Sequence, residues 1–337
     1  MYFVATVGGS SHLWRQRFPD KTPEQITFGP TEEEGIALAP DGGSLVTSVG
    51  MRHGAIWMHD AAGERPISSE GYASAPRLSR DGKHLFYLLQ WDSDSITSSG
   101  ELRDVDLASG KSGSLLPGLS VKDYDISPDE REVAFTTTQS DGESQIWLAS
   151  LDRRSAPSQV ARGGDEASFG AHGELLFRML EKNLNFLGRV NRDGSGLERI
   201  LNTPILNKLS VSPDGEWIIV FAPLAGEKAA SEAATPETVA VPVRGGARQK
   251  ICSGRCPPIW SSDGRFLYVE NPPGKTLAIP VPAGRALPDL PAPGVGLVAL
   301  PGARVIEQGN LFPGPDPATY VFQRTELRHN LFRIPLH

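Results

Sequence analysis

Short apolar runs alternate with polar turns along the whole chain. One phrase recurs: a short strand, a turn resembling Ser-Pro-Asp-Gly and a denser apolar run, as in LAPDGGSLVTSV at Leu38 and VSPDGEWIIVFA at Val211. Because Asp-Gly between apolar runs favours a tight hairpin, each copy predicts two antiparallel strands joined by a short turn. The copies begin at Leu38, Leu78, Ile126, Phe169, Val211 and Trp260, with a degenerate copy at Phe312.

The spacing of these copies predicts the architecture. Their turns recur every 40 to 49 residues, about 44 on average, which is the length of a four-stranded propeller blade. The strand after the turn is the most apolar, as expected where neighbouring sheets cover both faces. A third strand carries an aromatic residue, and a short polar fourth strand suits an outer edge. The third strands are HLWRQRF at His12, AIWMHD at Ala55, QIWLASL at Gln145 and NLFRIPL at Asn330. We therefore predict an all-β propeller of seven or eight four-stranded blades.

The repeat units leave the closure of the ring open. We place the units near residues 2–28, 34–69, 74–116, 122–161, 166–201, 207–252, 257–290 and 306–336 of a single domain. The first unit lacks its first strand, and the last lacks its fourth. Either eight units form eight blades, or an N-terminal strand at 24–27 completes the last blade, giving seven blades and a spare hairpin. Residues 223–238 predict a flexible surface loop, and residues 284–302 a Pro-rich connector.

The repeat resembles that of TolB-like, WD-related propellers. The segment from His12 through the first turn, the ICSGRC at Ile251 and the closing segment from Leu300 also resemble the C-terminal region of bacterial membrane-anchored serine/threonine protein kinases. The resemblance implies a sensor or interaction role outside the membrane. It implies no kinase activity here, because the chain has no phosphate-cradling glycine loop, His-Arg-Asp loop or Asp-Phe-Gly motif.

Composition and charge narrow the function further. The chain has 337 residues, a net charge of -7, and 36 glycines and 28 prolines, which indicate many turns. Its acidic balance argues against nucleic-acid binding, and no apolar run is long enough to span a membrane. The N-terminus lacks a signal-peptide pattern, which predicts a cytoplasmic chain as written. A membrane-anchored parent would instead make this region periplasmic or extracytoplasmic, so the compartment stays open.

A search for catalytic motifs yields no catalytic, metal or cofactor assignment. The nearest string to a serine nucleophile elbow, Gly110 to Ser114, lacks the second glycine at the required place. The seven histidines include no H-x-x-x-H or H-x-H pair that would indicate a zinc site. We therefore expect no enzyme activity and no cofactor.

Two groups of residues are candidates for ligand binding on the loop face. Glu32, Glu33 and Glu34 form an acidic run that could meet a basic partner, although a solvated charged segment explains it as well. Trp91, Asp92 and Asp94 lie in a loop between two strands, where a solvated polar loop is the plain alternative.

The cysteines allow two main interpretations. Cys252 and Cys256 could form a short-loop disulfide in an oxidising compartment or remain a pair of free thiols, and a metal is the less favoured alternative.

Three hypotheses for function follow. The leading one is a non-catalytic recognition module that binds a protein, a peptide or a small ligand on its loop face. The second is a propeller hydrolase or lyase with Asp, Glu and His gathered at the channel mouth, which predicts shifted pKa values there. The third is a structural fragment of a larger multi-blade protein, which predicts an unpaired strand edge.

Overall fold

The fold is built almost entirely from antiparallel strands. The computed structural model describes residues 1–7, 10–19, 21–29, 31–90, 99–223, 236–270, 273–290 and 296–336. Within these ranges the chain forms strands β1 to β28 and one short 3-10 helix at Leu297–Ala299. No helix in these ranges is long and apolar enough to cross a membrane.

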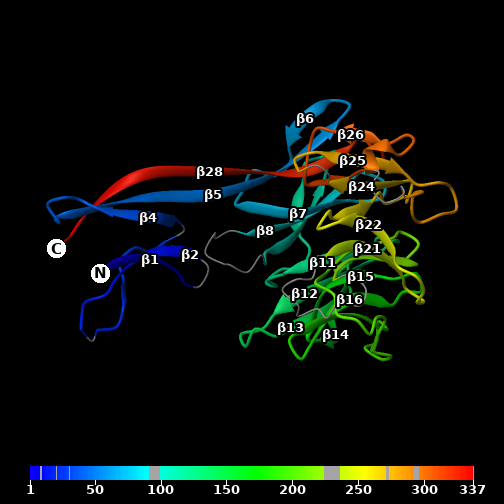
Figure 1. The fold of residues 1–337 in the computed structure, drawn as a ribbon, viewed down its shortest axis with the longest axis horizontal. Coiled ribbons are helices and arrows are strands. Elements are labelled where there is room, and N and C mark those ends of the chain that lie inside the picture. Colours follow the sequence, from blue (N-terminus) through cyan, green and yellow to red (C-terminus); the bar gives the residue numbers. More distant parts are fainter. Residues whose placement is uncertain are drawn as a thin grey trace.

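Within the described residues, five four-stranded blades follow one another, and the first of them is also joined to the strand at Ser44–Asp60 by a parallel bridge between Tyr72 and Gly54 (Figure 1). In each, consecutive strands pair antiparallel, so the second and third strands of one repeat form a hairpin. The sheets are β7–β10 (Tyr72–Leu78, His84–Gln90, Glu101–Asp106, Ser112–Ser114), β11–β14 (Asp123–Ile126, Glu132–Thr138, Ser144–Ser150, Ser158–Arg162), β15–β18 (Gly164–Phe169, Leu175–Glu181, Leu184–Val190, Glu198–Arg199), β19–β22 (Asn207–Val211, Trp217–Ala222, Glu237–Pro242, Gln249–Ser253) and β23–β26 (Pro258–Trp260, Phe266–Glu270, Thr276–Pro280, Arg304–Ile306).

A sixth four-stranded sheet joins the two ends of the chain. It combines β27 (Leu311–Pro313) and the first half of β28 (Tyr320–Pro335) with the second half of β5 (Ser44–Asp60) and β6 (Gly63–Pro66). Its side chains pack against β23–β26 on one side and β7–β10 on the other. Within the described residues, six blades therefore close into a ring.

The halves of β5 and β28 that lie outside the ring form an arm (Figure 1). These strands pair without a break from Tyr320 opposite His59 to Pro335 opposite Ser44, and β4 (Glu32–Leu38) pairs along the outer half of β5. A separate sheet of β1 (Tyr2–Val7), β2 (Ser10–Arg15) and β3 (Glu24–Gln25) packs against β4. Gly50 allows the two long strands to approach, because a Cβ there would lie 2.5 Å from the His329 ring.

Side-chain hydrogen bonds explain the recurring Ser-x-Asp turn. Ser127 Oγ donates to Asp129 Oδ1 at 2.7 Å and accepts the amide N–H of Glu132 at 2.9 Å. The hydrogen bond from Ser127 holds the pKa of Asp129 below its usual value. The same arrangement recurs at Ser79, Ser212 and Ser261. A local motif thus sets the first hairpin of four blades.

The hydrophobic core lies between adjacent blades. Phe135 in β12 and Leu102 in β9 are fully buried in one such layer, and Ile146 in β13 packs with Phe177 in β16 in the next. Each blade therefore buries both faces, which explains the near-continuous apolar runs of the second strands.

The propeller architecture is confirmed, whereas the count of seven or eight four-stranded blades is not. The predicted units 34–69 and 306–336 do not turn between their second and third strands but continue through as β5 and β28. Most of the predicted loop 223–238 lies outside the described residues. The connector 284–302 is partly anchored, because Leu287 and Leu297 are buried in the core beside β25.

Candidate functional site

The acidic run predicted as a binding segment lies in strand β4. Glu33 is buried, and its Oε2 accepts a hydrogen bond from Thr27 Oγ1 at 2.6 Å and lies 3.0 Å from His12 Nδ1. These contacts tie β4 to the β1–β3 sheet, so Glu33 has an internal structural role. Glu34 is exposed. Ligand binding by Glu32 and Glu34 stays a prediction.

The second predicted group and the cysteines have different outcomes. Trp91, Asp92 and Asp94 lie outside the described residues, so their role stays a prediction.

Cys252 and Cys256 are joined by a disulfide with their Cα atoms 6.5 Å apart, at the end of β22. Cys256 is buried in the core between two blades. The bond therefore fastens the polar outer strand of this blade to its core.

A charged cluster that the sequence did not predict lies on and beside the first strands of successive blades, with Arg178 on the second strand of its blade. We call Arg77, Lys122, Asp123, Asp125, Asp165, Glu166, Arg178 and Lys208 the inner-strand cluster. The first strand β15 approaches β11 on one side and β19 on the other. Arg77 Nη1 donates to Asp125 Oδ1 at 2.9 Å, which links β7 to β11. Lys122 Nζ donates to Asp165 Oδ2 at 2.7 Å, which carries the network to β15.

Lys208 and Glu166 extend the network to β19. Lys208 Nζ donates to Ser168 Oγ at 2.8 Å, and the Lys208 amide donates to Glu166 Oε2 at 3.2 Å. Glu166 has a φ of 55° at a bulge in β15, a conformation that is rare for side-chain-bearing residues. The bulge directs its carboxylate towards the next blade.

Burial shifts the pKa values of this cluster in different directions. Burial raises the pKa of Asp123 and of Glu166 and lowers that of Lys208. For Asp165, burial alone would raise the pKa, but hydrogen bonds from Arg178 and Lys122 outweigh it and lower the pKa. Asp123 Oδ1 accepts from Thr136 Oγ1 at 2.8 Å, while its buried Oδ2 has no hydrogen-bond partner. Opposed shifts of this kind occur at functional sites and in structural ion networks alike.

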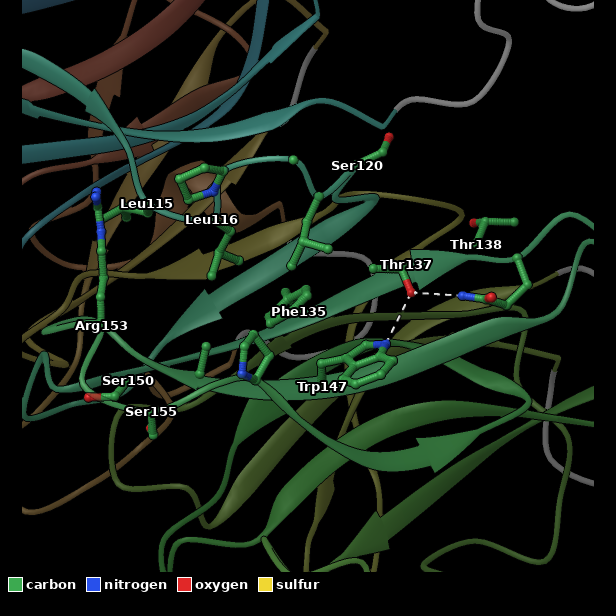
Figure 2. A pocket seen from close by; sticks show the side chains of 16 residues that line it. Leu115, Leu116, Ser120, Phe135, Thr137, Thr138, Trp147, Ser150, Arg153 and Ser155 are labelled. Carbon is green, nitrogen blue, oxygen red and sulfur yellow. Dashed lines mark hydrogen bonds between the residues drawn. The ribbon is translucent and has the colours of Figure 1, made fainter.

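A groove lies between blades β7–β10 and β11–β14 (Figure 2). We call it the interblade groove. Its volume of about 570 Å³ falls within the range of ligand pockets. The lining residues are Leu115 to Ser120, Phe135, Thr137 to Gln139, Trp147, Ala149, Ser150, Arg153, Ser155 and Pro157.

The groove has an apolar floor and two polar ends. Phe135 and Trp147 form the floor, and Trp147 Nε1 donates to Thr137 Oγ1 at 3.1 Å (Figure 2). Thr137 Oγ1 also accepts from Gln139 Nε2, at the end where β12 enters its loop. At the other end, Arg153 donates to the Ser114 carbonyl and holds a φ of 58°.

The sequence did not predict the interblade groove. Trp147 packs against the core between blades β7–β10 and β11–β14, but it is only partly buried because one side lines the groove. The charged residues in first strands, such as Asp165 and Lys208, were a readable signal, since apolar residues are expected there. Within the described residues, no group of three or more His, Cys, Asp or Glu side chains is placed to hold a metal ion.

Comparisons with known proteins agree on the fold. No family model and no curated protein sequence matches the chain. A putative TolB from Agrobacterium tumefaciens shares 15% identity and a TM-score of 0.57, covering 82% of this chain and 99% of that protein. The fold is that of a TolB-like β-propeller. TolB from Acinetobacter baumannii shares 14% identity and a TM-score of 0.50, covering 85% of this chain and 61% of that longer protein.

The TolB-like fold does not by itself select an activity. An oligogalacturonate lyase in complex with manganese shares 11% identity and a TM-score of 0.49 over 74% of this chain and 82% of that protein. That similarity is too distant to bear on chemistry. The resemblance to the C-terminal region of membrane-anchored kinases is not matched by these comparisons.

Proposed function

We propose that this TolB-like propeller is a non-catalytic recognition module that binds an extended segment of a partner protein. The interblade groove is the observation that carries the proposal. Its apolar floor suits aliphatic or aromatic side chains, and the Thr137 and Gln139 end offers hydrogen bonds to a peptide backbone. Arg153 at the other end favours a carboxylate on the same segment.

The position of the groove agrees with recognition on the loop face. Gln139 begins the loop between β12 and β13, and residues 115–120 connect one blade to the next. Such connections tolerate sequence change, while the blades hold them in place. A rigid ring with a lined groove at its loops can therefore bind a partner without a conformational change of its own.

A peptide selection tests this function directly. Random peptides displayed on phage are selected for binding to the full chain, and the affinities of the selected peptides are measured by fluorescence polarisation. Ser120 is an exposed groove residue, and Ser120→Arg is expected to weaken binding at least about tenfold by filling the groove. Ser140→Arg, an exposed loop change outside the groove, is the matched control. Equal binding by both variants would contradict the proposal.

The charge at one end of the groove gives a second readout. Arg153→Glu is expected to weaken the binding of acidic peptides and to leave the binding of neutral peptides unchanged, because only the acidic peptides lose an ion pair. If the variant binds acidic and neutral peptides with equally reduced affinity, Arg153 has no role in recognising charge.

We further propose that the chain works outside the membrane as the sensing part of a signalling kinase. The sequence resemblance suggests the kinase, and the Cys252–Cys256 disulfide supports an oxidising compartment. A membrane-anchored kinase carrying this chain should change its autophosphorylation rate when a selected peptide is added, and Ser120→Arg should abolish the response. An unchanged rate with bound peptide would separate recognition from signalling.

The inner-strand cluster supports a second candidate function, a hydrolase or lyase. Asp123 and Glu166 have raised pKa values and lie near Lys208, whose pKa is lowered. A screen of ester and phosphoester substrates tests this candidate. A turnover abolished by Glu166→Gln and retained in Ser120→Arg would favour the enzyme.

A further inference from the structure

Two repeats exchange strands in this structure. In five blades the second and third strands of one repeat pair with each other. In repeats 34–69 and 306–336 these strands run on as β5 and β28 and pair with the other repeat instead. The exchange preserves one second-to-third strand pairing in the ring and creates another in the arm.

The arm sheet is an incomplete blade with one partly covered face, on which Leu45 and Thr47 are buried while Ile36, Leu38 and Phe332 are 37%, 61% and 50% exposed. The sheet contains β4, the first half of β5 and the second half of β28. The face bearing Glu33 contacts the β1–β3 sheet through His12 and Thr27. Residues opposite one another in register share a face. Glu34, Ser48 and Leu331 therefore lie together on the other face, with Ala37, Val46 and Arg333 in the next row.

Leu331 identifies what the second face lacks. It occupies the position before the aromatic residue of the third strand, as do Leu13, Ile56 and Ile146. Those three side chains are 0% exposed, whereas Leu331 is 78% exposed. The repeat uses this position to pack one sheet on the next, because a single repeat cannot bury its own apolar face. The missing neighbour is therefore another β-sheet.

Charges of opposite sign lie at the two edges of this face, and Arg333 Nε also donates to Ser44 Oγ at 2.7 Å within its own chain. Glu34 on the β4 edge and Arg333 on the β28 edge are both exposed. A two-fold axis parallel to the strands places β4 of one copy over β28 of the other. Glu34 then meets the row of Leu331 and lies diagonal to Arg333 of the second copy, and the same contact forms twice.

We propose that this face of the arm binds the same face of a second copy of the chain, so that the protein associates as a two-fold dimer through its arms. Sheets stacked in this way lie about 10 Å apart, as blades do in the ring. The dimer would bury Leu331 and leave the interblade groove of each propeller accessible.

Sedimentation velocity of the full chain over a range of concentrations tests the association. The wild-type chain is expected to form a reversible dimer, and Leu331→Asp to weaken it at least about tenfold. Leu197→Asp is the matched control, since Leu197 is also an exposed leucine but lies in the ring before β18. A monomeric wild-type chain, or equal dimerisation by Leu331→Asp, would overturn the proposal.

A double cysteine variant tests the geometry. Within one chain, positions 34 and 331 are separated by the intervening strand β5, which is too wide for a disulfide. Glu34→Cys with Leu331→Cys is therefore expected to give a covalent dimer on oxidation, and either single variant to give little. A double variant that stays monomeric would count against the face-to-face arrangement.

A second cysteine pair tests the competing arrangement, in which repeat 34–69 closes on itself. Val49 and Ala55 lie in one continuous strand, about 20 Å apart at the usual rise per residue. Val49→Cys with Ala55→Cys can cross-link within one chain only if β5 folds into a hairpin. The proposal predicts no such cross-link, and its formation would show that the arm face is covered by the chain itself.

Discussion

Arg178 and Asp165 form a two-pronged ion pair between neighbouring strands of one blade. Nε and Nη2 of Arg178 each donate to a different oxygen of Asp165 at 2.7 Å. Arg178 also reaches Asn207 Oδ1 at the start of the next blade, at 3.0 Å. The pair therefore belongs both to its own sheet and to the contact between blades.

Loss of Arg178 should destabilise the ring. Arg178→Met leaves Asp165 buried with Lys122 as its remaining cation, and breaking a buried pair costs about 3 kcal/mol. The free energy of unfolding from urea titration measures this loss. Arg189→Met, which breaks an exposed pair with Glu198, should cost about 1 kcal/mol or less. Equal losses of unfolding free energy in the two variants would mean that Asp165 is well solvated.

The same pair should make stability depend on pH in acid. The folded pKa of Asp165 is lowered, so its contribution is complete above the unfolded value of about 4 and is lost as the pH falls through the folded pKa. The difference between the wild-type chain and Arg178→Met should therefore narrow below about pH 4. Urea titrations at several pH values check this, and a constant difference would argue against the ion pair as its source.

The ionisation of Asp123 should make stability change with pH in the opposite direction. Burial raises its folded pKa, so the wild-type chain loses stability as the pH rises from about 4 through that value. Asp123→Asn keeps an oxygen for Thr136 and removes the charge. It should be more stable than wild type at pH 7 by about 1 kcal/mol, with the gain vanishing near pH 4. A variant less stable at pH 7 would show that the carboxylate has a cationic partner.

The recurring turn serine should contribute measurably to each blade. Ser127→Ala leaves the Glu132 amide without its side-chain acceptor and should cost about 1 kcal/mol in the free energy of unfolding. The repeat at Leu38 has alanine at this position, Ala39, so its turn already lacks the hydrogen bond. Ala39→Ser should therefore leave stability unchanged or increase it. A loss for Ala39→Ser would show that the arm turn differs from those of the ring.

The disulfide should stabilise the outer strand of its blade. Replacing Cys252 and Cys256 by serine removes a short cross-link, which the chain-entropy account values at about 2 kcal/mol. Urea titration with and without reductant measures this loss. Reductant should lower the stability of the wild-type chain and leave that of the double variant unchanged. A loss of stability in both would mean that reductant acts through something other than this disulfide.

Much of the fold could be predicted because the repeat is encoded locally. The hydrogen bonds of Ser127 and Asp129 span at most five residues, and the glycines of the related turns adopt a positive φ. Each turn can therefore form wherever this short sequence motif occurs. The regular spacing then predicts stacked four-stranded sheets. The candidate binding residues were harder to predict, since Glu33 was expected to bind a ligand on the loop face but lies buried in β4 against His12.

By itself, the sequence determined the propeller, its repeat period and the turns that start most blades, because these depend on contacts between neighbours in the chain. Only the tertiary structure decided the strand exchange between β5 and β28, the interblade groove beside Trp147 and the ion network around Asp165. A strand of one repeat pairs equally well with the matching strand of another, so local pattern cannot choose between them. That choice, like the groove and the network, depends on how separate blades pack.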